Sequence, residues 1–410
     1  MANIAPFRGT LYNPEKIKDP VRVTAPPYDV ISPEEQETLY NSDTHNIIRI
    51  LLGKDLPGDD EKENKYMRAK KSLDEWQKKS IIKRDDKECI YVYQQEFEVD
   101  GKAKKRLGFI SLLKLEEFDT SSTSVYPHEY TLDAPKKDRT SLLSTIEANL
   151  GPIFAVFADE DKSIDAILAQ EAKSPPIIDV VDLHGMRNKL WRVSSKDTVA
   201  KIVELMKKEK IFIADGHHRY EVGLAFSKTM KDPKYGYILS YFTDLCADGL
   251  VILPVHRMIK GLSLDILEGL KKDLSSRVSF KALSSKEEVA SFLSGAKAAE
   301  KRFVMYVGSK FTGLQISDSD GLDVTVLHDL IVEPLKKMTE QKNLNFSVDF
   351  TKDLNYAVTE VDKGRSFMSI LVNPTKITEI RDTAFSGKRM PQKSTYFYPK
   401  VLTGLVINVF

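Results

Sequence analysis

The hydrophobic and polar positions of this chain follow two periods, and each period predicts a different element. Helical spacing is clear in one charged stretch, where the apolar positions are Tyr66, Ala69, Leu73 and Trp76. Short continuous apolar runs predict buried strands at 46–52, 152–158 and 211–214. Helices and strands therefore alternate, which is typical of mixed sheets covered by helices.

Turn and cap signals set the borders of several elements. An Asp-Gly pair at 100–101 separates the strand-like segments 90–99 and 104–113, and this dipeptide favours a tight hairpin. The sequence Ser-Pro-Glu-Glu at 32–35 combines a serine N-cap, a first-turn proline and a reciprocal glutamate, so a helix is expected to begin there. A short strand is expected at 21–25.

A change of character near residue 260 predicts a domain border. Beyond it, charged amphipathic helices at about 264–277 and 284–295 flank apolar strands. We therefore expect an α+β, mixed α/β protein in three parts. These are an N-terminal α/β segment (1–115) packing on the core, a central domain (116–258), and a C-terminal α+β domain (259–410).

Composition narrows the classes of protein. The chain has 410 residues and a net charge of +1, so no global field recruits nucleic acid or an anionic membrane. Its two cysteines, Cys89 and Cys246, cannot form a disulfide framework or a Cys-rich zinc site. No apolar run approaches the roughly 20 residues that span a bilayer, and the N-terminus lacks the features of a signal peptide. A cytoplasmic location without a membrane partner is expected.

The strongest candidate site is Asp215-Gly216-His217-His218-Arg219. An apolar strand runs into this turn and a helical segment follows it. Such a turn directs backbone N–H groups and the positive end of a helix dipole to one place, and arginine can bind phosphate bidentately. The sequence predicts a phosphate site, against the plainer alternative of an Asp-Gly turn with satisfied histidines.

A second candidate is His128-Glu129, which precedes Asp133 and Arg139. A carboxylate beside a histidine could accept a proton from a hydroxyl group, or hold Mg²⁺ through Glu129 or Asp133. A solvated polar loop that caps the next helix is the alternative.

Two further segments could line the same site. The C-terminal basic segment carries Arg389, Lys393 and Lys400 among aromatic residues, and could line an anion site or stack a base. The turn containing Tyr28 and Asp29 could form a wall. The alternatives are a basic connector and a rigid turn. The chain lacks a Walker A loop, a dinucleotide glycine fingerprint, a nucleophile elbow and a His-Glu-x-x-His motif.

Five segments together carry a resemblance to a known family. They are Pro-Phe-Arg-Gly (6–9), Ala-Pro-Pro-Tyr-Asp-Val-Ile-Ser (25–32), His-Glu-Tyr-Thr-Leu (128–132), Ala-Asp-Gly-His-His-Arg-Tyr-Glu (214–221) and Met-Pro-Gln-Lys-Ser-Thr-Tyr-Phe-Tyr-Pro-Lys (390–400). In this set and order the chain resembles the family called domain of unknown function 1015, over nearly its whole length.

A more distant resemblance concerns function. A His-Glu pair, a helix, a Pro-Ile strand and an Asp-Gly-His-x-Arg turn are similar to the free serine kinase branch of the ParB/sulfiredoxin superfamily. The resemblance implies a ParB/sulfiredoxin-like core, with Glu129 as catalytic base and His217, His218 and Arg219 as ligands of nucleotide phosphates. It implies that Asp215 is a metal ligand or a turn former.

The leading hypothesis is a phosphotransferase that uses a nucleoside di- or triphosphate and Mg²⁺, held through Glu129 or Asp215, to phosphorylate a small hydroxyl compound such as serine. The expected residues are Glu129, Asp215 and His217 for catalysis, Gly216, His217, His218, Arg219, Arg389 and Lys393 for phosphates, and Tyr28, Asp29, His128 and Arg139 for the substrate pocket. A ParB-like nucleotide switch or DNA-associated regulator is the first alternative, and a non-catalytic phosphate-binding protein the second. The sequence disfavours nucleic acid as a partner and leaves a homodimer open.

Overall fold

The chain folds into two compact units in a computed structural model. The structure describes residues 2–118, 123–131, 133–297, 299–317, 319 and 321–410. The first unit comprises Met1–Val251 and Pro399–Phe410, and the second comprises Ile252–Tyr398. This division differs from the three expected parts, because segments 1–115 and 116–258 contribute strands to one sheet and the last twelve residues return to the first unit.

A mixed sheet forms the centre of the first unit. In the described residues it has nine strands, in the order β6 (Val125–Tyr126), β11 (Ile211–Asp215), β8 (Ile153–Phe157), β12 (Tyr237–Asp244), β5 (Lys102–Lys114), β4 (Ile90–Val99), β10 (Arg187–Val193) and β9 (Ile178–Val181), with β1 (Ile4–Ala5) beside β5. β6 is parallel to β11 and β8 is parallel to β12, whereas β8 and β11 are antiparallel. The sheet is therefore mixed, as expected.

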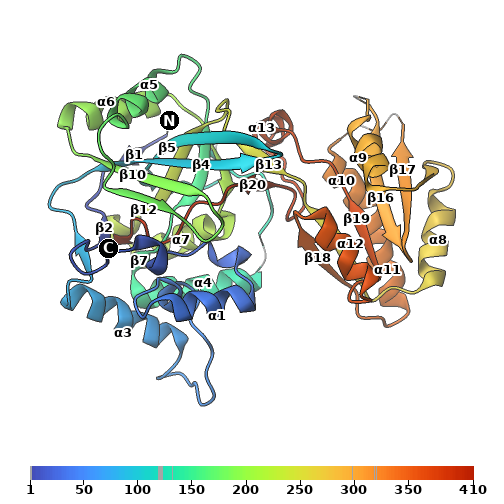
Figure 1. Ribbon diagram of the computed structural model, residues 1–410, viewed down its shortest axis with the longest axis horizontal. Coiled ribbons are helices and arrows are strands. Elements are labelled where there is room, and N and C mark those ends of the chain that lie inside the picture. Colours follow the sequence, from blue (N-terminus) through green and yellow to red (C-terminus); the bar gives the residue numbers. More distant parts are fainter. Residues whose placement is uncertain (1, 119–122, 132, 298, 318, 320) are drawn as a thin grey trace. The chain divides into compact units, whose positions relative to one another are not determined.

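Helices cover both faces of this sheet. α5 (Ser163–Glu171) and α6 (Lys196–Met206) lie on one side, and α3 (Lys65–Lys78), α4 (Asp133–Ile146) and α7 (His217–Met230) on the other (Figure 1). A strand that is covered on both faces has all of its residues buried, and every residue of β8 is buried. This explains why its sequence is a continuous apolar run rather than an alternating one.

Local signals in the sequence identified several elements correctly. The hairpin of β4 and β5 turns at Asp100 and Gly101, both with positive φ (50° and 71°), as a tight hairpin turn requires. α1 (Pro33–Ser42) begins after Ser32, whose side chain accepts from the Glu35 N–H at 3.1 Å. α3 buries Ala69, Leu73 and Trp76.

Two short strands were predicted wrongly, and in each segment a polar side chain accepts from a backbone N–H at the start of a helix. Residues 46–52 contain the short helix α2 (Ile48–Leu51), and the buried Asn46 side chain accepts from the Ile48 N–H at 2.8 Å. Residues 21–25 overlap the 3₁₀ helix η1 (Pro20–Val23), where the Asp19 side chain accepts from the Val21 N–H at 3.1 Å. Local capping therefore outweighed the apolar run.

The second unit contains a separate antiparallel sheet. Its order is β15 (Ser279–Leu283), β17 (Lys310–Ile316), β16 (Lys301–Val307), β19 (Met368–Leu371), β14 (His256–Lys260) and β18 (Ser347–Thr351). Successive strand residues face opposite sides. Phe303 and Met305 pack in the cluster with α8 (Leu264–Leu274), whereas Val304 packs with α9 (Lys286–Ser294). The expectation of a mixed α/β protein with an additional α+β unit is confirmed.

The other helices of the second unit are α10 (Asp323–Leu327), which continues through a π-helical turn (His328–Val332) into α11 (Glu333–Gln341), α12 (Leu354–Asp362) and α13 (Ile377–Phe385). A strand pair, β13 (Val251–Leu253) with β20 (Tyr396–Tyr398), accompanies them. In the first unit, β2 (Thr10–Tyr12) pairs with β3 (Ile82–Arg84). β21 (Asn408–Val409) pairs with β7 (Ala148–Asn149), so the C-terminal residues are tied to the strand that precedes β8.

Candidate functional site

The candidate site lies at one edge of the first unit's sheet. The parallel strands β6 and β11 end at this edge, and the antiparallel strand β8 begins there. Strand direction therefore brings His128-Glu129, which follow β6, to the same edge as Asp215, which ends β11. Ligand sites in α/β proteins commonly lie at the carboxyl ends of parallel strands.

Gly216 joins β11 to α7 in a conformation that favours glycine. Its φ is +93°, and a Cβ atom there would lie 2.9 Å from Ile153 Cγ2 and 3.0 Å from Arg219 Nη2. Its carbonyl accepts from the Tyr220 N–H at 3.0 Å, so α7 starts immediately after the turn. The first turn of α7 carries no acidic side chain and Gly216 offers no side-chain cap. The positive end of the helix dipole is thus directed at the site without an acidic residue of the helix to offset it.

Asp215 lies between two cations. Lys400 Nζ is 2.7 Å from Asp215 Oδ1, and Arg219 Nη2 is 3.3 Å from Asp215 Oδ2. The side chains of Asp215 and Lys400 are only 17% and 11% exposed. Both carboxylate oxygens accept from cations, and the three side chains carry a net charge of +1. A positive net charge at a helix N-terminus favours an anion.

Arg219 also holds the loop that leads into β8. Its Nη1 donates to the Pro152 carbonyl at 2.6 Å and to the Gly151 carbonyl at 3.3 Å. The guanidinium therefore ties the turn to the neighbouring strand. The sequence predicted that Arg219 binds phosphate bidentately. In this structure one of its two terminal nitrogens is engaged by backbone carbonyls, and its role as a phosphate ligand stays a prediction.

Two histidines pack together beneath the turn. The His128 N–H donates to His217 Nε2 at 3.3 Å, and the two rings meet edge to face with centroids 4.7 Å apart. Burial, followed by the nearby His128 ring, lowers the pKa of His217 to about 3. His217 is therefore neutral near pH 7 and acts as a hydrogen-bond acceptor. His218 is only half-buried.

Glu129 lies beside the buried His128. Its Oε1 is 3.7 Å from His128 Nε2, while His128 Nδ1 is 2.7 Å from the Ile213 carbonyl. Because a carbonyl only accepts, Nδ1 carries a proton and the ring is held against β11. The β11 backbone thus orients the His128 ring, and the other ring nitrogen faces the Glu129 carboxylate. The assignment of Glu129 as a base stays a prediction.

Tyr28 and Arg139 stack on one another next to this group. The Arg139 guanidinium lies 4.2 Å from the centroid of the Tyr28 ring, and Arg139 Nη1 donates to the Leu51 carbonyl at 2.9 Å. Burial, and to a lesser extent the charge of Asp29, raises the pKa of Tyr28 to about 12. The Tyr28 hydroxyl is therefore protonated near pH 7. Asp29 itself is exposed.

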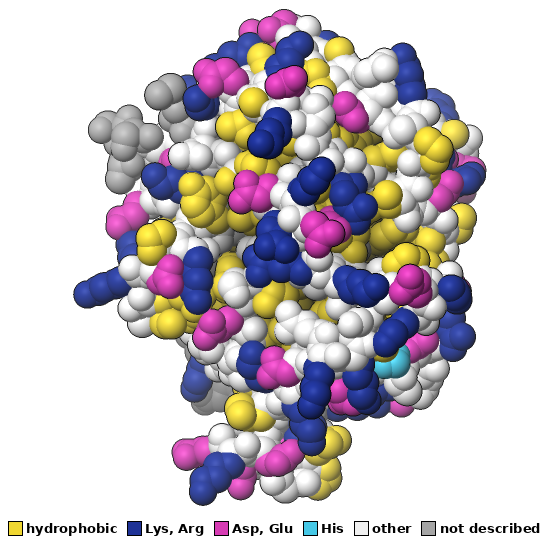
Figure 2. Space-filling model, turned by 90° about the vertical axis from the view of Figure 1, so that its left-hand side faces the viewer, with side chains coloured by type: hydrophobic (Ala, Val, Ile, Leu, Met, Phe, Trp, Pro, Cys, Tyr) yellow, Lys and Arg dark blue, Asp and Glu magenta, His cyan; other side chains and the backbone are white. Residues whose placement is uncertain are grey.

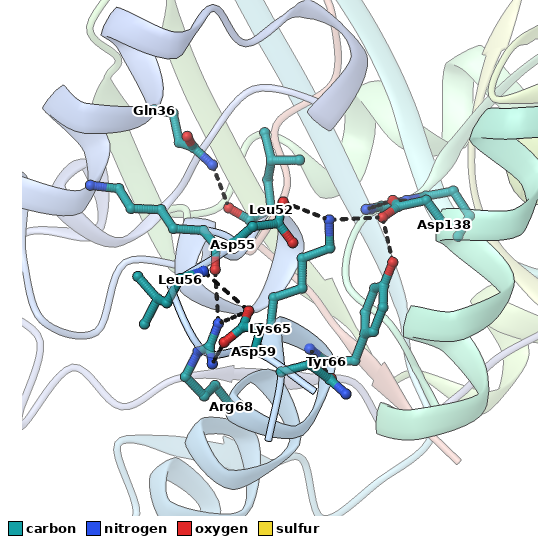
Figure 3. Close-up of polar contacts among 12 residues, drawn as sticks. Gln36, Leu52, Asp55, Leu56, Asp59, Lys65, Tyr66, Arg68 and Asp138 are labelled. Atoms are coloured by element: carbon teal, nitrogen blue, oxygen red, sulfur yellow. Dashed lines mark hydrogen bonds and ion pairs between the residues drawn. The ribbon is translucent and has the colours of Figure 1, made fainter. Parts of the chain in front are cut away.

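Asp138 fixes Arg139 from the other side. Arg139 Nε donates to Asp138 Oδ2 at 2.9 Å, and the Tyr66 hydroxyl donates to Asp138 Oδ1 at 2.7 Å. Lys65 Nζ lies between Asp138 and Asp55, 3.4 Å and 3.2 Å from their oxygens (Figure 3). α3 and the residues before it thus hold the carboxylate that holds Arg139.

A cavity of about 70 Å³ adjoins the turn. Arg219, Arg139 and Tyr28 line it, whereas Asp29 and His128 do not. The structure therefore brings two of the four expected substrate-pocket residues to one cavity next to Arg219. Their role in binding a substrate stays a prediction.

The comparisons with known proteins first concern the family. A sequence model of the family described as "Protein of unknown function (DUF1015)" matches residues 4–340. The chain belongs to this family. The resemblance seen in the sequence motifs is thereby confirmed, although the motif at 390–400 lies beyond the matched residues. None of the curated proteins matches significantly.

This DUF1015 chain is also similar to solved structures at low identity. A free serine kinase in complex with AMP is 14% identical, and the match covers 72% of this chain and 96% of the kinase with a TM-score of 0.39. A conserved hypothetical protein from Pyrococcus furiosus is 13% identical, over 68% and 89% of the two chains, with a TM-score of 0.38. SbnI with a C-terminal truncation, from Staphylococcus aureus, is 12% identical, over 72% and 85%, with a TM-score of 0.38.

Magnesium fits poorly at Asp215. Both of its oxygens already accept from Lys400 and Arg219, so a cation there would compete with two resident charges. Within the ranges that the structure describes, no group of three His, Cys, Asp or Glu side chains could hold a metal ion. Of the three expected ligands, Glu129 and Asp133 stay predictions, and the geometry disfavours Asp215.

Lys400 was not among the phosphate ligands of this site that were predicted from the sequence. It lies in the basic segment, but the phosphate site was assigned to Arg389 and Lys393, which belong to the second unit. Their assignment stays a prediction. The pairing of Lys400 with Asp215 was not predicted, because only the return of the chain into the first unit brings the two residues together. The basic segment and the family motif at 390–400 were the signals that pointed to Lys400.

The face of the molecule seen in Figure 2 carries charges of both signs. In Figure 2, Lys and Arg side chains are interspersed with Asp and Glu side chains, and neither sign forms a continuous block among the coloured residues. A mixed pattern of this kind does not produce a field of a single sign. In the part of the chain that the structure describes, no helix is both long and apolar enough to cross a bilayer.

Proposed function

We propose that this protein binds a nucleoside phosphate at the β11–α7 turn and transfers a phosphoryl group to a small hydroxyl compound. One observation carries the proposal. The N-terminus of α7, Arg219, Lys400 and the carboxylate of Glu129 come from distant parts of the sequence to one edge of the sheet. Anion binding and proton acceptance are the two capacities that phosphoryl transfer needs.

In the proposed reaction the acceptor oxygen attacks the terminal phosphorus of the nucleotide. A new P–O bond forms, the bond from phosphorus to the bridging oxygen breaks, and the shorter nucleotide leaves. The hydroxyl proton passes to Glu129. Arg219, Lys400 and the first N–H groups of α7 offset the charge on the phosphoryl oxygens. Asp215 then serves to hold the two cations.

Magnesium would enter with the nucleotide. Mg²⁺ in such sites is usually held by one or two carboxylates together with substrate phosphates. Because Glu129 accepts the proton in this proposal and Asp215 is engaged by cations, the nucleotide phosphates would supply most of the Mg²⁺ ligands. When bound, Mg²⁺ would neutralise phosphate charge.

The test is nucleotide binding followed by product analysis. Thermal unfolding is measured with AMP, ADP, ATP and other nucleotides, with and without Mg²⁺. Ligand at a hundred times its Kd adds about 2.7 kcal/mol of stability, which is readily seen. The stabilising nucleotides are then incubated with small hydroxyl compounds, serine included, and phosphorylated products are measured by ³¹P NMR. The absence of a shift with every nucleotide would contradict the proposal.

Two variants separate binding from chemistry. Glu129→Gln should keep the nucleotide shift and lower turnover by about 10²–10⁴-fold, whereas Arg219→Ala should weaken both. Glu117→Gln is the matched control, because Glu117 is an exposed carboxylate that pairs with Lys228 at the far end of α7. It should match the wild type. Full turnover in Glu129→Gln would remove Glu129 from the reaction.

A further inference from the structure

The cavity beside Arg219 is lined by residues of the first unit. It lies between α4, α7, β7, the start of β12 and the turn at Tyr28, with Thr403 at one wall. Its volume is about 70 Å³. One water needs roughly 10–15 Å³ by the same measure, so there is room for on the order of five water-sized groups. That suits a molecule of a few heavy atoms.

Most of the wall is aliphatic. Leu142, Leu143 and Ile146 contribute from α4, Val222 from α7 and Ile238 from β12. The lining contains no carboxylate. An apolar wall of this kind favours a ligand with a compact apolar body. A polar group of the ligand would find no hydrogen-bond partner there.

The polar groups of the lining are mainly donors. Thr403 is 2% exposed and lines the cavity, and its hydroxyl can donate a hydrogen bond. Arg219 Nε is also buried and, among the described residues, without a partner. The Asn149 oxygen accepts from the Leu239 N–H at 3.1 Å, which leaves its amide NH₂ as a donor. Buried polar groups normally have partners, so these donors indicate an absent acceptor-rich ligand.

The charge of the lining gives the sign of that ligand. Arg139 and Arg219 both line the cavity, and their carboxylate partners Asp138 and Asp215 do not. Tyr28 adds a hydroxyl group. A negatively charged group is therefore favoured at the polar end, and an amine is disfavoured.

We propose that this cavity binds a small monocarboxylate with a compact apolar body, with the carboxylate toward Arg219 and Thr403. Because the cavity shares Arg219 with the turn, the bound acid would be the phosphoryl acceptor when it carries a hydroxyl group. That last role rests on the proposed function, but binding of the acid does not. Serine suits the cavity less well than an apolar acid of equal size, since its ammonium and hydroxyl groups meet aliphatic walls.

The test measures binding to the full chain without nucleotide, by calorimetry and ligand-detected NMR. The probes are isovalerate, serine and isopentylamine, which are of similar size. Isovalerate should bind, and the other two should bind at least about tenfold more weakly. Thr403→Val keeps the shape of the side chain and removes its hydroxyl, and it should weaken isovalerate binding about five- to tenfold.

Thr10→Val is the matched control. The Thr10 hydroxyl is buried and without a partner within the described residues, but Thr10 does not line the cavity. It should bind isovalerate like the wild type. Equal binding of isopentylamine and isovalerate, tighter binding of serine, or no effect of Thr403→Val would each overturn the inference. If isovalerate binds but no nucleotide does, the cavity assignment stands and the phosphotransferase proposal falls.

If nucleotide also binds, 2-hydroxybutyrate provides the link between the two sites. It should be phosphorylated faster than serine at equal concentration, and Thr403→Val should raise its KM about five- to tenfold with little change in kcat. A lower kcat at unchanged KM would contradict a binding role for Thr403.

Discussion

Lys400 Nζ donates to Asp215 Oδ1 at 2.7 Å, although 185 residues separate the two along the chain. Asp215 ends β11 and Lys400 lies just after β20, where the chain returns to the first unit. With Arg219 on the other oxygen, Asp215 holds two cations in position beside the start of α7. The ion pair therefore connects the C-terminal segment that returns to the first unit with the charged residues of the candidate site.

Replacing Lys400 should destabilise the first unit. Lys400→Met removes a charge-assisted hydrogen bond from a carboxylate that is only 17% exposed, so we expect a loss of about 1–3 kcal/mol in the free energy of unfolding. Urea denaturation measures it. Adding Asp215→Asn should cost less than the sum of the two single variants, because the residues interact directly. Strict additivity would show that the pair is not energetically coupled.

Stability should depend on pH through His217. Its pKa falls from 6.5 to about 3 on burial, so the unfolded chain binds the proton more tightly than the folded protein. The stabilisation is complete above about pH 6.5 and declines as the pH falls towards 3, by at most about 1.4 kcal/mol per pH unit. His217→Gln keeps an acceptor for the His128 N–H and should flatten the curve.

A second histidine contributes with the same sign. Burial, with the neighbouring Arg257, lowers the pKa of His256 to about 4, and His256 belongs to the second unit. Part of the acid sensitivity should therefore persist in His217→Gln and disappear in the double variant with His256→Gln. Urea curves from pH 4 to 8 measure this, and an unchanged slope in His217→Gln would contradict the assignment.

The turn should not tolerate a side chain at Gly216. Gly216→Ala combines a φ of +93° with contacts of 2.9 Å to Ile153 and 3.0 Å to Arg219, so we expect a loss of at least about 1–2 kcal/mol and weaker nucleotide binding as Arg219 is displaced. Gly269→Ala is the control. Gly269 lies within α8 with nothing within 4 Å of an added Cβ, and alanine there should stabilise by up to about 1 kcal/mol. Equal effects would contradict the strain argument.

Arg139 should not be replaceable by lysine. Lysine cannot reproduce the fork that contacts Asp138 and the Leu51 carbonyl while stacking on Tyr28. Arg139→Lys should therefore lower the free energy of unfolding by about 1–3 kcal/mol and weaken binding in the cavity. Lys137→Ala, at an exposed neighbouring position on α4, should change neither by more than about 0.5 kcal/mol. Wild-type stability of Arg139→Lys would show that the fork is dispensable.

Elements with strong local signals could be predicted from the sequence. The Asp100-Gly101 hairpin, the Ser32 cap and the apolar face of α3 each depend on neighbours within a few residues. Predictions at 46–52 and 21–25 were wrong because a single side chain, Asn46 or Asp19, satisfied the backbone in a helical form. An apolar run alone does not distinguish a strand from a short capped helix.

The sequence by itself determined the β11–turn–α7 unit, the family and the residue types of the candidate site. A turn with glycine between a strand and a helix can be predicted from the sequence, because it depends only on neighbouring residues. The tertiary structure alone decided which distant groups join it. Strand direction brought Glu129 to the edge of Asp215, the returning C-terminal residues supplied Lys400 and Thr403, and the packing of α4 on α7 left a donor-lined cavity. These relationships depend on contacts between residues far apart in the chain, which no local period or spacing encodes.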